Sequence, residues 1–171
     1  IPALRIHPRV LPGGEESLLA ATEFDRARIV QAAPVRRLQQ KTQVFPLDVK
    51  ASVRSRLTHS LEVQETGRQI SRQILAELPA DAVCPWSFIN LVEMACLLHD
   101  VGNPPFGHFG EQVMGQWLGE QLDPLFAMAV GQGSEQWPLL RADLLGFDGN
   151  AQSLRLVHSL HELNLTLGQL A

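Results

Sequence analysis

The sequence predicts an all-α protein. Apolar residues recur at helical spacing along most of the chain, and the longest such series runs through Leu57, Leu61, Ile70 and Ile74. The chain has no strand-length alternation of apolar and polar residues. It also has no glycine-rich phosphate loop and no internal repeat. Prolines and glycines gather between the helical stretches, where they are expected to form turns. These features favour a bundle of helices over a fold that contains a sheet.

An irregular arm is expected before the first helix. Residues 1–16 hold three prolines and Gly13-Gly14 but no apolar period. After this arm, helices are expected over residues 17–31, 35–44, 52–78, 85–100, 111–122 and 151–170. The stretch between the last two helices carries several glycines and is expected to be looser.

The first three helices are defined by prolines and by apolar residues one turn apart. Pro34 can open the second helix, because the N–H that it lacks has no partner in a first turn, and Pro46 stops it. Pro79 ends the long third helix, whose inward face is the leucine and isoleucine series named above. In the first helix, the residues expected to face inward are Leu18, Leu19, Phe24, Ala27 and Val30.

The fourth helix is expected to lie at the centre of the core, because it is apolar almost throughout, and to have His99 and Asp100 as its last residues. The residues of the fifth helix expected to face inward are Val113, Trp117 and Leu118. The sixth helix is expected to bury a seam of Leu156, Leu160, Leu163 and Leu167.

Composition and charge narrow the class of protein. At 171 residues, with 45% hydrophobic and 19% charged residues, the chain fits one globular domain. The net charge of −4 gives no overall attraction to nucleic acid or to anionic membranes, so any anion site must be local. Cys84 and Cys96 form no CxxC pair, which argues against a thiolate zinc site and favours a reducing, cytoplasmic setting. No run of about 18 apolar residues is present, so no membrane-spanning segment is expected.

The residues that carry the chemistry are concentrated between Cys96 and Glu111. An apolar run delivers His99 and Asp100 into a loop rich in glycine and proline, which leads on to His108 and Glu111. Imidazole and carboxylate groups suit borderline-to-hard divalent metal ions. Histidine and glutamate side chains that lie close together also commonly act as general acids and bases. The stretch therefore predicts metal-assisted hydrolysis.

A third metal ligand must come from another helix, and His59 is the natural donor. It lies on the long helix, off the stripe formed by Leu57 and Leu61, and 40 positions before His99. That separation fits two helices joined by a short connection. A lone histidine of this kind is more often a hydrogen-bonded core residue. Here, however, His59 is followed along the chain by His99 and Asp100, and this combination favours a metal centre.

His108 and Glu111 are three positions apart, so they share a face if a helix begins near His108. A carboxylate beside an imidazole can orient the ring and raise its pKa, which suits acid–base work. The alternative is that Glu111 only complements the N-terminal dipole of its helix.

Two other sets of polar side chains are candidates for sites. His158 and His161 are also three positions apart, but only Glu162 accompanies them and it points elsewhere on the helix, so no second metal is expected. Basic and amide side chains of the first half fit either a solvated helix face or contacts to phosphate oxygens. They are Arg36, Gln39, Gln43, Arg54 and Arg56.

The order of these motifs resembles the HD-domain metal phosphohydrolases. Longer blocks narrow the resemblance to the dGTP triphosphohydrolases of that superfamily, and it runs from about Phe24 to Ala171. The blocks are residues 36–47, 54–60, 99–111 and 147–152 with 155–158. The resemblance implies an HD-domain helical bundle.

The resemblance also implies hydrolysis of dGTP, or of a related deoxynucleoside triphosphate, to the deoxynucleoside and tripolyphosphate. Under it, a divalent ion, Mg²⁺ or Mn²⁺, is bound by His59, His99 and Asp100, and the catalytic pair is His108 and Glu111. The substrate-binding residues are Gln43, Arg36 and Asn150. It further implies a homo-oligomer with single-stranded DNA as an effector.

Two other functions stay open at this point. One is an HD-type phosphodiesterase that acts on a nucleotide or cyclic nucleotide, and the other is a non-catalytic regulatory module that responds to nucleic acid. The resembled family has a fourth metal ligand, an aspartate on a helix after the last matching block. Asp143 lies before that block and Asp148 within it, so neither aligns with that ligand. Residues 1–23 are therefore expected to be an arm and the start of the first helix. Residues 24–171 are expected to be the N-terminal portion of an HD domain without that later helix, inactive alone if the missing ligand is essential.

Overall fold

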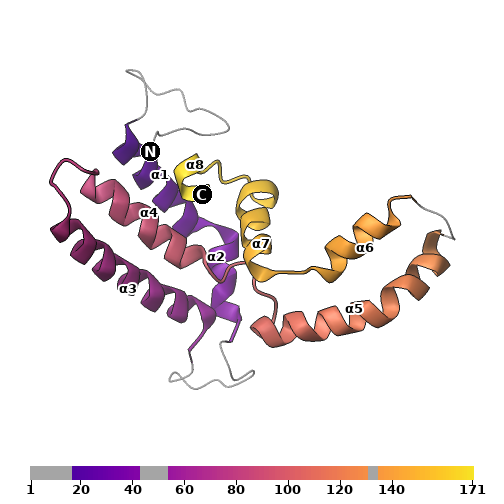
Figure 1. The fold of residues 1–171 in the computed structure, drawn as a ribbon. Helices are drawn as coiled ribbons and strands as arrows, with labels where there is room; N and C mark the ends of the chain where they lie inside the picture. Colours follow the sequence, from indigo (N-terminus) through magenta and orange to yellow (C-terminus); the bar gives the residue numbers. More distant parts are fainter. Residues whose placement is uncertain (1–16, 43–53, 131–134) are drawn as a thin grey trace.

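The computed structural model describes residues 17–42, 54–130 and 135–171, and every regular element in these ranges is helical. The longer helices are α1 (Leu18–Gln31), α3 (Arg56–Glu77), α4 (Pro85–Leu98), α5 (Gly107–Val130) and α6 (Trp137–Leu145) (Figure 1). The shorter elements are α2 (Ala33–Arg37), a 3₁₀ turn η1 (Leu38–Gln40), α7 (Gly149–Leu154), a π-helical segment η2 (Arg155–Leu160) and α8 (Leu167–Leu170). The predicted all-α class is confirmed.

Helix α4 lies at the centre of a helical body that it forms with α1, α3 and α8. It packs against both α1 and α3, with α8 close by (Figure 1). Met94 and Leu97 of α4 are buried together with Ile29 of α1 and Leu165. Because α4 is apolar almost throughout, it can bury more than one face, as the sequence predicted.

Polar caps fix where the helices begin. The hydroxyl of Ser17 accepts a hydrogen bond from the N–H of Ala20 at the start of α1. Ser55 does the same for α3 by accepting from the N–H of Thr58. Since His59 is in the first turn of α3, this cap also fixes the backbone that carries it.

Helices α5 and α6 form an arm that projects from the body (Figure 1). The rings of Phe126 and Trp137 stack with centroids 3.8 Å apart, and Nε of Arg141 lies 3.1 Å from Oδ1 of Asp123. Leu122 is the one hydrophobic side chain of the arm that is buried within the described ranges. No described helix, α5 included, is both long and apolar enough to cross a membrane.

Two helix ends in the first half differ from the prediction. The second helix was expected to run over 35–44, but η1 ends at Gln40 and Lys41 is extended. The reason is that the carbonyl of Lys41 accepts a hydrogen bond from the N–H of Arg56, at 2.8 Å, instead of continuing the helix. Helix α4 ends at Leu98, so His99 and Asp100 lie in the turn that follows and not within the helix.

Three predictions for the second half are also wrong. Helix α5 is longer than residues 111–122 and continues through Pro124. The stretch predicted to be loose contains α6. The helix predicted over 151–170 is broken after η2, where Glu162 and Asn164 have φ values of 43° and 49°. Thr166 then starts α8, because its N–H and hydroxyl both donate to the Asp25 carboxylate and its hydroxyl accepts from Gln169 N–H.

Helix α3 buries a face that the apolar pattern did not predict. Its buried residues are Arg56, Ser60, Gly67 and Ser71, whereas Leu61, Ile70 and Ile74 are exposed. The small residues let α3 approach α4 closely, since a Cβ at position 67 would lie 2.6 Å from Sγ of Cys96.

Similar errors affect three other predicted inward faces. Helix α1 buries Ala21, Thr22, Asp25 and Ile29, while Leu19 and Val30 are exposed. Exposed residues elsewhere are Val113 and Trp117 of α5 together with Leu160 and Leu167. Apolar periodicity shows which residues share a face of a helix, but another element must be present to cover that face.

Candidate active site

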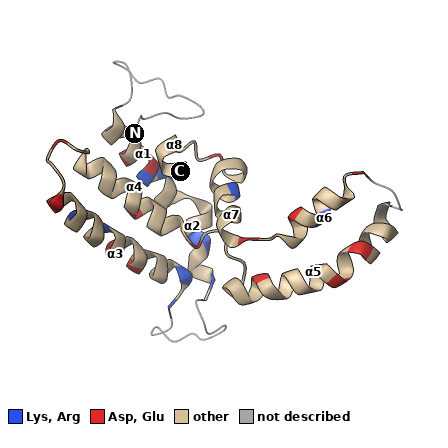
Figure 2. Cartoon of the chain, in the orientation of Figure 1, with Lys and Arg blue, Asp and Glu red and all other residues tan. Residues whose placement is uncertain are grey.

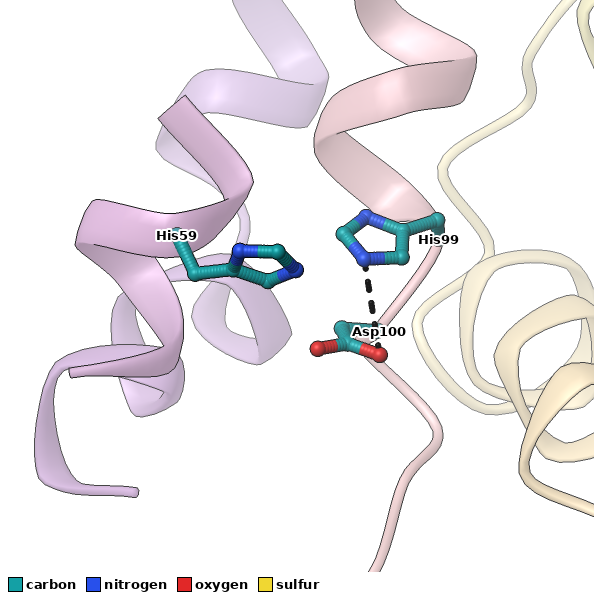
Figure 3. A group of neighbouring side chains, drawn as sticks. All are labelled: His59, His99 and Asp100. Carbon is teal, nitrogen blue, oxygen red and sulfur yellow. Dashed lines mark ion pairs between the residues drawn. The ribbon is translucent and has the colours of Figure 1, made fainter. Parts of the chain in front are cut away.

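Three potential metal ligands come together where the start of α3 passes the end of α4. His59 belongs to α3, and His99 and Asp100 directly follow α4. One ligand atom from each of the three lies within 4.8 Å of the others (Figure 3). The rings of His59 and His99 have centroids 5.3 Å apart and planes inclined by 71°. The structure thus brings together the residues that the sequence predicted as a group.

A backbone contact fixes the orientation of the His99 ring. Its Nδ1 lies 2.7 Å from the carbonyl oxygen of Cys96. Because a carbonyl can only accept, Nδ1 must carry the proton and Nε2 is left with a free lone pair. Nε2 lies 3.5 Å from Oδ1 of Asp100. A histidine held in this way through its other nitrogen is typical of metal ligands.

Both oxygens of the Asp100 carboxylate have a partner. Nη1 of Arg56 donates to Oδ2 at 2.7 Å, and Nδ2 of Asn103 donates to Oδ1 at 2.6 Å. Asp100, Arg56 and Asn103 are all buried. A buried carboxylate requires such partners, because the cost of removing an unpaired charge from water is several kcal/mol.

The donor set fits a divalent metal ion. Two imidazole nitrogens and a carboxylate oxygen are the ligands that such ions take from proteins when thiolates are absent. Three protein ligands would leave coordination positions for water or for a substrate oxygen. Within the described residues, His59, His99 and Asp100 form the only group of this kind.

A histidine–glutamate pair lies at the start of α5. Nδ1 of His108 is 2.8 Å from Oε2 of Glu111, and the His108 ring is otherwise open to solvent. The hydrogen bond to Glu111 and its negative charge raise the pKa of His108 above its usual value. Oε1 of Glu111 accepts a hydrogen bond from the N–H of Gly149, at 3.0 Å. Glu111 therefore does more than face the helix dipole, because it connects His108 to α7.

The start of α5 lies against Arg56, the arginine that pairs with Asp100. Gly107 has a φ of 58°, and a Cβ at this position would overlap the guanidinium group of Arg56. A glycine is needed here on both counts. Arg56 thus contacts the carboxylate of the ligand group on one side and the residue before His108 on the other.

Known proteins have segments similar in sequence to this one. Residues 56–133 match the model of the HD domain family. Over these residues the chain is similar to HD domain proteins. An HD domain implies a divalent metal ion, and the cluster described above supplies residues that could hold one. His59, His99, Asp100, His108 and Glu111 all lie inside the matched segment.

Similarity to individual proteins extends over most of the chain. The deoxyguanosinetriphosphate triphosphohydrolases of Serratia proteamaculans (strain 568) and Yersinia enterocolitica are 45% and 46% identical to it over 181 residues. A probable deoxyguanosinetriphosphate triphosphohydrolase of Pseudomonas aeruginosa is 52% identical over 166 residues. Each alignment covers 91% of this chain but only 36%, 36% and 33% of the respective relative. The chain therefore spans about a third of the length of the curated relatives that it matches.

The predicted substrate-binding residues lie outside the HD domain match. Gln43 is outside the described residues. Arg36 of α2 is exposed, and its guanidinium donates to the carbonyl of Gln31. Asn150 of α7 lines a cavity of about 270 Å³ that also reaches His99. The structure thus places Asn150 near His99 of the metal-ligand group, while Arg36 contacts the last residue of α1.

Sequence reasoning missed two residues that support the cluster. In the sequence, Arg56 fits either a solvated helix face or a contact to phosphate, but in the structure it is buried against Asp100. The signal was available, because Arg56 and His59 are three positions apart and so share a face of α3. Asn103 was not singled out, although it stands in the same loop as Asp100.

Lys41 is a third missed contact. Its Nζ donates to the carbonyl of Asn103 at 2.8 Å. Burial and the nearby charges of Arg56 and Arg37 lower the pKa of Lys41. Its position could not be predicted, because it depends on how the end of η1 packs against the loop.

Proposed function

We propose that this chain belongs to the catalytic part of a metal-dependent deoxynucleoside triphosphate triphosphohydrolase that converts dGTP to deoxyguanosine and tripolyphosphate. The main support is the proximity of His59, His99 and Asp100, followed along the chain by the hydrogen-bonded pair His108–Glu111. The names of the most similar relatives support the choice of dGTP as substrate.

In this proposal His59, His99 and Asp100 hold the divalent ion, which is Mg²⁺ or Mn²⁺. When bound, such an ion supplies positive charge that polarises a phosphoryl oxygen. Arg56 holds Asp100 in place by a hydrogen bond to Oδ2, and the free Nε2 of His99 lies on the same side as the carboxylate. The triad lacks a second carboxylate, and we propose that an aspartate on a later helix, after residue 171, supplies it.

His108 and Glu111 act on the attacking water. Glu111 accepts a hydrogen bond from Nδ1–H of His108, which leaves Nε2 of the exposed ring as the base. Water attacks the α-phosphorus and its bond to the 5′ oxygen breaks. Tripolyphosphate leaves with the oxygen of the water, and a proton returns to the 5′ oxygen of deoxyguanosine. No covalent intermediate is required.

The substrate contacts belong to the same proposal. Asn150 contacts the nucleoside, which is supported by the cavity that it shares with His99. Arg36 contacts phosphate once its guanidinium leaves the carbonyl of Gln31, which is supported by its exposure. Gln43 contacts the base or sugar, as the family resemblance implies.

We also propose a cytoplasmic homo-oligomer that responds to single-stranded DNA. The exposed apolar residues of α3 and α5 support self-association. Figure 2 shows basic residues together at α2 and the start of α3, while acidic residues lie along the arm. This separation of charge supports a local site for a polyanion in spite of the negative net charge. The two free cysteines are consistent with a reducing compartment.

Product analysis tests the proposed function. The protein at its full encoded length is incubated with dGTP and Mn²⁺ or Mg²⁺, and phosphorus NMR follows the products. Tripolyphosphate and deoxyguanosine are expected, and His99→Ala serves as the inactive control. Release of pyrophosphate or of single phosphate would contradict the reaction type, and hydrolysis of cyclic nucleotides alone would favour a phosphodiesterase.

A further inference from the structure

Asn103 stands at the junction of the loop between α4 and α5. Its side chain is buried, at 5% exposure, and Nδ2 lies 2.6 Å from Oδ1 of Asp100. Its backbone N–H donates to the carbonyl of Asp100, at 3.2 Å. Because a carboxylate can only accept, Nδ2 is the atom that must face Asp100 and Oδ1 of Asn103 must face the other way.

The orientation of Asn103 is itself fixed from two sides. Nζ of Lys41 donates to its backbone carbonyl at 2.8 Å. On the other side, Oδ1 of Asn103 faces Gly149, where a Cβ would overlap it and would lie 2.6 Å from Oε1 of Glu111. The absence of a side chain at position 149 therefore leaves room for both the amide of Asn103 and the carboxylate of Glu111.

The contacts of Asp100 show why the amide is needed. Arg56 contacts Oδ2, and a single contact of this kind leaves the carboxylate free to turn about it. His99 does not prevent that rotation, since its Nε2 is 3.5 Å from Oδ1, which is too long for a hydrogen bond. The donor that holds Oδ1 toward His99 is Nδ2 of Asn103.

We propose that Asn103 is a positioning residue that turns Oδ1 of Asp100 toward Nε2 of His99 and so prepares the group to share one divalent ion. This inference rests on the metal centre of the proposed function. Residues that orient a metal ligand commonly change metal affinity by about 10-fold to 100-fold when they are replaced. The role of Asn103 is thus to set affinity and coordination without contacting the ion.

Metal binding tests the inference directly. In the protein at its full encoded length, Asn103→Ala is expected to weaken Mn²⁺ binding about 10-fold to 100-fold in calorimetry and to alter the visible spectrum of bound Co²⁺. The matched control is Asn90→Ala, because Asn90 is also buried but donates to Glu23 at 2.7 Å, away from the cluster. Asn90→Ala is expected to lower thermal stability without changing the affinity or the spectrum.

A second variant distinguishes loss of the hydrogen-bond donor from loss of folding. Asn103→Leu keeps a similar volume but has no donor, and it is expected to weaken Mn²⁺ binding as much as Asn103→Ala. If a folded Asn103 variant binds Mn²⁺ as tightly as the wild type, with the same Co²⁺ spectrum, the positioning role is overturned while the metal centre stands. If the wild-type protein itself binds neither ion, the metal centre fails and the inference fails with it.

Discussion

The helical body and the projecting arm both contain large apolar side chains but bury them to different extents. Body helix α4 buries Met94 and Leu97 in a shared core, whereas the arm exposes Val113, Trp117 and Met128. The candidate site lies where the two regions meet. Its potential metal ligands belong to the body, and His108 and Glu111 belong to the base of the arm. Folding energy and metal binding should therefore depend on the body, and proton transfer on how the arm is attached.

The Arg56–Asp100 ion pair is expected to give the largest difference in stability between the body and the arm. Arg56→Gln leaves the buried Asp100 carboxylate without its cation, and the loss should be about 3–5 kcal/mol of unfolding free energy. Arg141→Gln removes the exposed pair with Asp123 in the arm and should cost about 0–1 kcal/mol. Denaturant unfolding followed by circular dichroism measures both, and equal losses would contradict the division between body and arm.

The two methionines give the next contrast. Met94 is fully buried in α4, so Met94→Ala should cost about 2–5 kcal/mol through lost burial and a residual cavity. Met128 is exposed in the arm, and Met128→Ala should change stability by no more than about 0.5 kcal/mol. The same unfolding assay tests this pair. A large cost at Met128 would mean that the arm is covered in solution.

Two glycines of α5 compare the first residue of the arm with a position farther along the same helix. Gly107→Ala places a side chain at a positive φ and against Arg56, and it should cost about 1–3 kcal/mol and lower activity. Gly115→Ala meets no atom within 4 Å, so it should stabilise the helix by roughly 0.5–1 kcal/mol. Thermal melting and hydrolysis rates distinguish the two. Equal behaviour would show that the contact of Gly107 with Arg56 does not hold the arm.

The smallest predicted effect is a shift in pH dependence. Glu111 raises the pKa of His108, and a base must be neutral to act, so activity should fall as the pH drops through that raised pKa. Glu111→Gln removes the negative charge, so the acidic limb of kcat/KM should move to lower pH while the maximum rate falls. A limb that moves to higher pH, or that stays in place, would contradict His108 as the base.

The sequence predicted which side chains of the site lie together better than it predicted the packing of the helices. His99 and Asp100 are neighbours, and the order of His59 before them carried the third potential ligand, so the group could be predicted from local motifs. The buried face of α3 could not be predicted, because Ser60, Gly67 and Ser71 form it by close approach to α4 while Ile70 is exposed. The roles of Arg56 and Asn103 also depend on that approach and on the path of the loop.

The central claim is that His59, His99 and Asp100 bind one divalent ion. Anomalous scattering from a crystal of the protein at its full encoded length, grown with Mn²⁺, tests it most directly. A single strong peak is expected within bonding distance of both imidazoles and of the Asp100 carboxylate. A peak elsewhere, or none at these three side chains while the protein hydrolyses dGTP, would contradict the account.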